Sequence, residues 1–277
     1  MKLTSICFAL AMGATFVCAS ASAQDTIGTD LLAYWDFNET EGTTCADYNN
    51  AATGTMGTGV THVDGPVVDF GKAVYFDGTA GTAIINLVQA DSVSSPDTNK
   101  LTWSYWIKFD KAFDTTGWRN YEGIVNSASG QDYFIVYKDN YNKQVRLKII
   151  AQDTAQKRWC LAGTELPSIG AWHHMACVWD GDKASDNMAW YVDGVKAVNC
   201  IDPEPTVWPT NKVRTSQTTC IGAKTNSNGQ ELQGSIDDLA MWKRALPEQE
   251  IQFIYNNGKQ LKDILDVKAE VSDWSLM

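Results

Sequence analysis

Alternation of apolar and polar side chains with a period of two is the sequence feature that most constrains the fold of this chain. Residues 101–109 (LTWSYWIKF) place an apolar side chain at every odd position, and residues 145–149 (VRLKI) repeat the pattern. Because successive side chains of a β-strand point to opposite faces of a sheet, such segments predict strands with one buried face. Similar segments, separated by turn signals such as Asp193-Gly194, recur from Leu31 to about Leu246. The pattern predicts an all-β fold of many short antiparallel strands.

One segment near the C-terminus has the pattern of a helix. Pro247 begins it, Glu248 and Glu250 lie in its first turn, and Gly258 follows as a stop signal. No internal repeat or Pro/Ser-rich linker divides residues 27–260, so these residues are expected to form one domain, either a sandwich or a jelly roll. Residues 261–277 are expected to form a helical tail or a linker.

The first 23 residues have the pattern of a secretory signal peptide. Lys2 supplies a positive start, residues 6–17 form a short apolar run, and residues 21–23 (ASA) form a small-residue cleavage signal. Cleavage after Ala23 would leave Gln24 at the N-terminus of a protein that is secreted, periplasmic or held at the cell surface. The apolar run is too short for a transmembrane helix, and no later segment reaches the roughly 18 apolar residues that one needs.

The charge balance excludes one class of partner. The chain has 22 Lys and Arg against 33 Asp and Glu, which gives a formal net charge of −11. Because a surface that binds phosphate backbones needs a basic patch, no nucleic-acid partner is expected.

Export would permit disulfides, and five of the seven cysteines follow residue 23. The predicted pair is Cys160 with Cys200, because Cys160 lies on the strand before the loop at Trp172, and Cys200 ends the return strand of a hairpin. A weaker second pairing joins Cys45 to Cys220. It leaves Cys177 as a free thiol that is buried like a small hydrophobic residue. No C-x-x-C spacing is present, so a zinc site is not expected.

Six signatures in a fixed order carry a resemblance to a known family. They are residues 32–39 (LAYWDFNE), 71–78 (GKAVYFDG), 101–108 (LTWSYWIK), 171–179 (AWHHMACVW) with 190–194 (WYVDG), 221–223 (IGA) with 234–239 (GSIDDL), and 244–251 (RALPEQEI). Together they resemble the laminin G-like jelly rolls of the concanavalin A-like lectin and glucanase superfamily. The resemblance covers roughly residues 31–258. It implies a sandwich of two curved antiparallel sheets, of six or seven strands each, with a short C-terminal helix.

The resemblance also suggests a metal site, because the N- and C-terminal strands of such a jelly roll are neighbours. Asp36 and Asn38 end the first strand, and Asp237 begins the last one. Carboxylate and amide oxygens at a strand junction suit calcium, which accepts six to eight oxygen ligands in irregular geometry. We therefore expect a structural Ca²⁺ at Asp36, Asn38 and Asp237. The alternative is that Asp36 and Asp237 hold turns by bonding backbone N–H groups.

Aromatic side chains with polar neighbours are the expected ligand contacts. Trp118 and Tyr121 lie in a polar loop, and Trp159 follows two basic residues. Sugars stack their apolar faces on such rings while neighbouring polar side chains bond the hydroxyl groups. Trp118, Tyr121 and Trp159 are therefore the predicted glycan contacts. For each ring the alternative is that it packs over its own loop.

The signatures of catalysis are missing from the sequence. Retaining glucanases of the superfamily place three acidic residues at alternate positions of one strand, and the chain has no such run. The patterns G-x-S-x-G and H-E-x-x-H are also absent. The sequence therefore favours a non-catalytic module that binds a glycan or an extracellular protein. Two alternatives remain, namely a glycoside hydrolase or lyase with an unrecognised site, and a structural surface protein without a small ligand.

Overall fold

The structure is a computed structural model that describes most of the chain. It describes residues 26–88, 91–94, 96–113, 121–128, 132–140, 143–149, 158–161, 167–197, 210–213, 218–224 and 230–266.

Eight of the described strands form one antiparallel sheet, which we call sheet A. They are β1 (Leu31–Trp35), β4 (Val60–Asp64), β5 (Lys72–Asp77), β7 (Lys100–Phe109), β12 (Trp172–Asp180), β13 (Met188–Val192), β14 (Val195–Lys196) and β16 (Gln233–Trp242). Their order is β14-β13-β12-β7-β16-β5-β4, and β1 pairs with β16 outside this path. The pairing of β1 with β16 brings the first and last strands together, as the resemblance implied.

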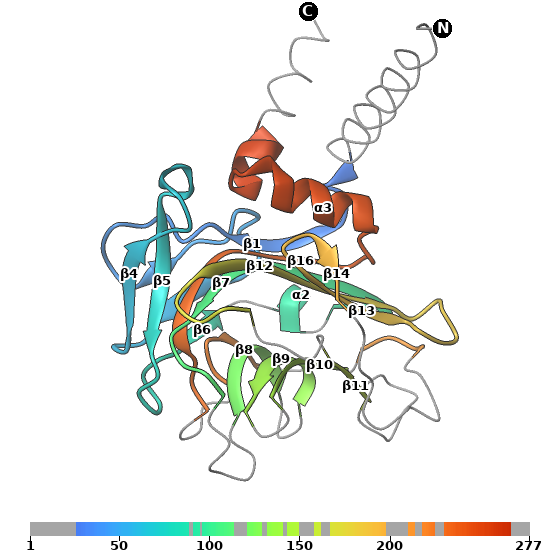
Figure 1. Ribbon diagram of the computed structural model, residues 1–277, viewed down its shortest axis with the longest axis horizontal. Coiled ribbons are helices and arrows are strands. Elements are labelled where there is room, and N and C mark those ends of the chain that lie inside the picture. Colours follow the sequence, from blue (N-terminus) through green and yellow to red (C-terminus); the bar gives the residue numbers. More distant parts are fainter. Residues whose placement is uncertain are drawn as a thin grey trace, which may run out of the picture.

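Eight further strands form sheet B. They are β2 (Thr44–Cys45), β3 (Thr53–Met56), β6 (Ile85–Val88), β8 (Tyr121–Ala128), β9 (Asp132–Asp139), β10 (Gln144–Ile149), β11 (Arg158–Leu161) and β15 (Thr218–Ile221). Their order is β11-β10-β9-β8-β15-β6-β3-β2. The two sheets lie face to face, with β7, β12 and β16 in one layer and β8 to β11 in the other (Figure 1). The predicted all-β sandwich of two antiparallel sheets is confirmed, with eight described strands in each sheet rather than six or seven.

The period-two pattern explains which residues fill the space between the sheets. On β7, the odd positions Trp103, Tyr105 and Ile107 are fully buried in the central cluster. Phe134 of sheet B packs against Trp103, with their ring centroids 5.3 Å apart. Burial of large aromatic and aliphatic side chains stabilises a fold by about 1.5–3 kcal/mol each, so this layer provides much of the stability of the sandwich.

The predicted C-terminal helix is α3 (Glu248–Asn257), and it covers the outer face of sheet A (Figure 1). Pro247 precedes its first turn, and Gly258 ends it in the left-handed conformation, with φ of 64°. Ile251 and Ile254 are buried against the sheet. The helical residues 261–266 add Leu261 and Ile264 to the same apolar cluster. The other described helices are the short α2 (Asp91–Ser94) and the 3-10 turn η1 (Val68–Phe70).

Three of the five cysteines lie among the described side chains. Cys45, Cys177 and Cys220 are buried thiols outside any disulfide. The weaker predicted pairing of Cys45 with Cys220 is wrong, because Cys45 belongs to the central core, whereas Cys220 packs in a separate small cluster with Ile84 and Ala223. The expectation that Cys177 is a buried thiol is confirmed. Cys200 lies outside the described residues, and the pairing of Cys160 with Cys200 stays a prediction.

Candidate functional site

The predicted metal ligands lie at the junction of β1 and β16. The antiparallel register pairs Trp35 with Leu239, which places Asp36 next to the irregular part of β16 that begins at Asp237. A register shift follows Asp237, and Asp238 has a positive φ of 50°. This bulge turns two consecutive carboxylates, Asp237 and Asp238, into the buried junction, where each is at most 2 % exposed.

Gln260 and Lys262, which follow α3, tie the junction together. The Asn38 amide nitrogen donates to Oε1 of Gln260 at 2.6 Å, and Nε2 of Gln260 donates to the carbonyl oxygen of Asp36 at 3.1 Å. The Lys262 ammonium lies 3.3 Å from Oδ2 of Asp36. The side-chain oxygen of Asn38 accepts the backbone N–H of Lys72 at 2.8 Å. The sequence prediction thus placed Asp36, Asn38 and Asp237 in one region correctly, but it missed Gln260 and Lys262.

The two buried carboxylates hold protons more tightly than an exposed aspartate. Burial, followed by the charge of Asp238, raises the pKa of Asp237 well above its ordinary value. Burial likewise raises the pKa of Asp238 to about 7, although hydrogen bonds from the Tyr34 hydroxyl and the Leu261 N–H oppose the shift. Asp36 raises both values through its charge. Burial therefore favours the neutral, protonated form of both carboxylates, whereas a bound cation would favour their ionised form.

The oxygen atoms of the junction fit a cation only in part. Oδ2 of Asp237 is buried without a hydrogen-bond partner, which leaves it available as a ligand. The oxygens of Asn38 and Asp36, however, already contact Lys72 and Lys262. In the described part of the chain, no group of three or more His, Cys, Asp or Glu side chains has an arrangement that could hold a metal. Among these oxygens, Oδ2 of Asp237 is therefore the one without an existing protein partner.

A second polar region lies on the face of sheet B that points away from the core. Phe134 and Val136 of β9 and Val145 and Leu147 of β10 belong to the central cluster, so the residues between them face outward. We call this the outer face of sheet B, and its residues Asn126, Arg146 and Lys148 are each at most 5 % exposed. One row of register partners across it contains Cys220, Asn126, Ile135 and Lys148, in that order.

Asn126 is the most unusual residue of this face. It is 1 % exposed, yet neither its side-chain oxygen nor its side-chain nitrogen has a hydrogen-bond partner. Nearby, Arg146 forms an ion pair with Asp139 at 3.0 Å, and both side chains are nearly inaccessible. Because an unpaired buried amide costs about 1–3 kcal/mol, the environment of Asn126 is not optimised for stability alone.

Two of the predicted glycan contacts have register partners on β9 and β10. Trp159 of β11 is the register partner of Lys148, and Tyr121 of β8 is the register partner of Asp139. Trp118 lies outside the described residues. Sequence analysis missed Asn126 and Arg146, although the alternation in residues 145–149 already indicated that Arg146 and Lys148 point away from the core.

The adjacent histidines of β12 lie on opposite faces of sheet A, as alternation predicts. His173 contacts Oδ2 of Asp193 at 2.7 Å and the Ser168 hydroxyl at 2.9 Å. His174 is fully buried and contacts the Ser104 hydroxyl at 2.8 Å. These contacts connect β12 to the turn after β13 and to β7, so both rings have structural partners.

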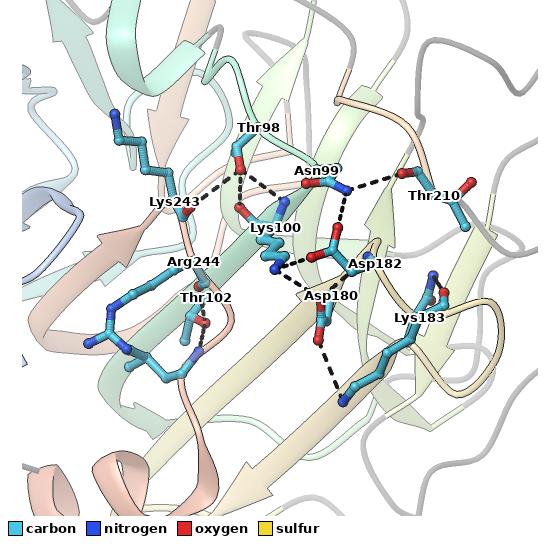
Figure 2. A network of polar contacts seen from close by, with 12 residues as sticks. Thr98, Asn99, Lys100, Thr102, Asp180, Asp182, Lys183, Thr210, Lys243 and Arg244 are labelled. Carbon is cyan, nitrogen blue, oxygen red and sulfur yellow. Dashed lines mark hydrogen bonds and ion pairs between the residues drawn. The ribbon is translucent and has the colours of Figure 1, made fainter. Parts of the chain in front are cut away.

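An acidic hairpin turn between β12 and β13 is neutralised by lysines. Figure 2 shows Lys100 between Asp180 and Asp182, and the two Asp180 oxygens lie 3.7 Å from the Lys100 ammonium and 3.6 Å from that of Lys183. Asn99 donates to Asp182 at 2.9 Å. Because the carboxylates of Asp180 and Asp182 already have cationic or amide partners, these contacts stabilise the turn.

The family of the chain can now be stated from its sequence and fold together. Residues 77–252 match the family described as the concanavalin A-like lectin/glucanases superfamily, and the chain belongs to it. No sequence among the curated proteins matches significantly. Among the described residues, no helix is long and apolar enough to cross a membrane.

Solved structures with the same fold include domains that bind ligands. The binding domain of Paraclostridial Mosquitocidal Protein 1 superimposes with a TM-score of 0.62 at 16 % identity, over 85 % of this chain and 53 % of the other. The ligand-binding domain of botulinum neurotoxin serotype D, in complex with N-acetylneuraminic acid, superimposes with a TM-score of 0.60 at 15 % identity. The match covers 87 % of this chain and 53 % of the other. This chain therefore spans about half the length of both toxin domains.

A structure of nearly matching length comes from an enzyme. Domain 4 of AbnA, an extracellular GH43 arabinanase from Geobacillus stearothermophilus in complex with arabinotriose, has a TM-score of 0.55 at 19 % identity. The match covers 80 % of this chain and 97 % of that domain. At these identities the three structures share the fold with this chain.

Proposed function

We propose that this protein is an exported binding module that recognises glycans through the outer face of sheet B. Membership of a superfamily of lectins and glucanases supports this function, as do the sugars bound in the arabinanase and neurotoxin structures. The signal-peptide pattern of residues 1–23 supports export. An extracellular protein partner is the alternative ligand.

The observation that carries the proposal is the unsatisfied amide of Asn126. A sugar hydroxyl can both donate and accept, so two neighbouring hydroxyls would satisfy the oxygen and the nitrogen of this amide together. Arg146, which forms an ion pair with Asp139, lies on the same face. Sites that are specialised for binding commonly retain such locally unfavourable groups, because the ligand completes their hydrogen bonds.

The first experiment is a glycan array that is probed with the chain lacking residues 1–23, with calcium and with a chelator. The proposal expects a defined set of glycans to retain the protein. Absence of binding to any glycan, combined with capture of an extracellular protein, would replace it with the alternative.

Substitution of Asn126 by leucine separates binding from stability. Leucine has a similar volume and no polar atoms, so Asn126→Leu should raise the free energy of unfolding by about 1 kcal/mol or more while it weakens glycan binding. Thr219→Val, a buried neighbour on β15 whose hydroxyl has a partner in Ser94, is the control that should destabilise the protein. An Asn126→Leu variant that is less stable and binds normally would show that the amide serves the fold.

The predicted glycan contacts are tested with Trp118→Ala. Loss of an aromatic stacking surface should weaken binding several-fold, since aromatic contacts contribute about 0.5–1.5 kcal/mol beyond their buried area. Titration calorimetry against a glycan from the array measures the change, with Tyr121→Ala and Trp159→Ala as parallel variants. Unchanged affinity in all three would exclude these aromatic residues from the contact surface.

We also propose that Ca²⁺ stabilises the junction of β1 and β16 by binding Asp237 with Asp36 and Asn38. The unpartnered Oδ2 of Asp237 and the neighbouring carboxylates of Asp36 and Asp238 support a cation at this position. Because a ligand that binds only the native state stabilises it by mass action, calcium should raise the melting temperature relative to chelator. Asp237→Asn should remove this difference, and an equal melting temperature in both conditions would refute the proposal.

A further inference from the structure

The structure contains a pocket that the proposed glycan site does not use. Its volume is about 350 Å³, and it lies beside the junction of β1 and β16. Its lining residues are Tyr34, Asp36, Asn38, Glu39, Ala46, Tyr48 and Lys262. A volume near the lower end of the roughly 300–1,000 Å³ that is typical of ligand pockets leaves space for a single small unit, such as one sugar residue.

Contacts within the fold hold the walls of this pocket in place. Oε1 of Glu39 accepts the backbone N–H of Ala46 at 2.6 Å, and the Tyr48 hydroxyl donates to Asp266 at 2.8 Å. The rings of Tyr34 and Tyr48 contact each other, with their centroids 6.0 Å apart. A ligand would therefore meet a largely preorganised surface, which lowers the entropic cost of binding.

Three groups in the pocket remain available to a ligand. Oε2 of Glu39 is buried and has no hydrogen-bond partner. Tyr48 is 43 % exposed and offers an aromatic surface. The Lys262 side chain is 42 % exposed, and its ammonium contacts Asp36 at 3.3 Å through one of three N–H donors. The pocket thus combines an acceptor, a donor and a stacking surface within a space of one sugar residue.

The charges in the pocket select among ligand classes. In the calcium-free protein the Lys262 ammonium is paired with Asp36, so the Glu39 carboxylate gives the pocket a net negative charge. An acidic sugar would place its carboxylate near Glu39, and the two negative charges would repel each other. A partly desolvated pocket strengthens this repulsion. A neutral hydroxyl group, in contrast, donates to Oε2 of Glu39 without any charge conflict.

We infer that this pocket is a second glycan subsite, which binds one neutral sugar residue through Glu39, Lys262 and the Tyr48 ring. The inference rests on the proposed glycan-binding function but concerns a different site. The lining residues all lie outside residues 77–252, the part of the chain that matches the family. The pocket lies beside β1 of sheet A, the end of β2 and the C-terminal helical residues, whereas the proposed site lies on β8 to β10 of sheet B. The module would therefore bind two sugar units at separate places.

The test compares variants of the chain lacking residues 1–23 on one glycan array and by calorimetry, in calcium and in chelator. Glu39→Gln replaces the carboxylate acceptor, and Tyr48→Ala removes the ring. Glu41→Gln alters a nearby exposed carboxylate as the matched control, and Tyr48→Phe keeps the ring without the bond to Asp266. Melting temperatures confirm that each variant is folded.

The expected result is a loss of affinity for neutral glycans of about tenfold for Glu39→Gln and several-fold for Tyr48→Ala. The control Glu41→Gln should bind as the unaltered chain does, and Tyr48→Phe, which keeps the stacking ring, should lose less affinity than Tyr48→Ala. For a short neutral oligosaccharide from the array, the weaker affinity of Tyr48→Ala should be confined to one of two sites, while Asn126→Leu retains the pocket site.

Two outcomes would overturn the inference and leave the proposed function intact. In the first, Glu39→Gln and Tyr48→Ala bind neutral glycans normally, whereas Asn126→Leu abolishes all binding. In the second, the site that depends on Tyr48 retains only acidic or only cationic glycans. An array without any bound glycan would instead refute the proposed function, and the pocket subsite with it.

Discussion

Buried His174 should contribute a loss of stability in mild acid, opposite in sign to the contribution of Asp238, whose raised pKa favours the native state as the pH falls. Burial lowers the pKa of this ring from 6.5 to about 4, and the charge of Asp193 only partly opposes the shift. The ring packs edge-on against Trp106, with centroids 5.5 Å apart, and its Nδ1 has no hydrogen-bond partner. Protonation would therefore place a charge in an apolar layer beneath α3.

The sign and size of the effect follow from proton linkage. In the unfolded chain His174 takes up a proton as the pH falls through 6.5, whereas in the native protein it resists protonation until about pH 4. Stability is therefore lost between these values, by about 3 kcal/mol in total and by about 2 kcal/mol between pH 7 and pH 5. Such a loss is a large part of the net stability of an ordinary domain, about 5–15 kcal/mol.

Urea denaturation at pH 7 and at pH 5 measures the net change in stability, and the difference between variants isolates the contribution of His174. In His174→Gln the amide can keep a hydrogen bond to Ser104 but carries no proton, so the loss between the two pH values should be smaller by about 2 kcal/mol. His173→Gln is the matched control, because the neighbouring ring lies on the opposite face and leaves His174 in place. If the unaltered protein and His174→Gln lose equal stability, the buried ring is not the source of the acid sensitivity.

Three further predictions concern the backbone, export and cysteine pairing. Gly222→Ala should lower the free energy of unfolding by more than about 2 kcal/mol, because φ is +82° and an added Cβ would lie 2.0 Å from a phenylalanine ring. Gly258→Ala, with φ of +64° and open space around it, should cost only about 1 kcal/mol in the same denaturation assay. N-terminal sequencing of the exported protein should begin at Gln24, and retention of residues 1–23 would contradict the signal-peptide interpretation. Peptide mapping without reduction should find Cys160 joined to Cys200, and a bridge from either of these two to another cysteine would disprove this pairing.

Local patterns determined the class of fold and the one substantial helix. The alternation in residues 101–109 follows from strand geometry alone, since every second side chain of any strand shares a face. The Pro247 start and Gly258 stop likewise reflect backbone preferences of single residues. The six signatures then restricted the order of the strands, so that the neighbourhood of Asp36 and Asp237 was predictable before any coordinates were known.

Only the tertiary structure decided which polar groups are unsatisfied and which cavities exist. Asn126 looks like an ordinary strand residue in the sequence, and its isolation depends on partners that β9 and β15 place opposite it. Glu39 and Lys262 are 223 positions apart and meet in one pocket because β1 pairs with β16 and the residues after α3 pack back over that junction. The sequence by itself determined periodicity and turns, which depend on neighbouring residues. Burial, pKa values and pockets depend on contacts between distant segments, and these arise only when the two sheets and the C-terminal helices pack together.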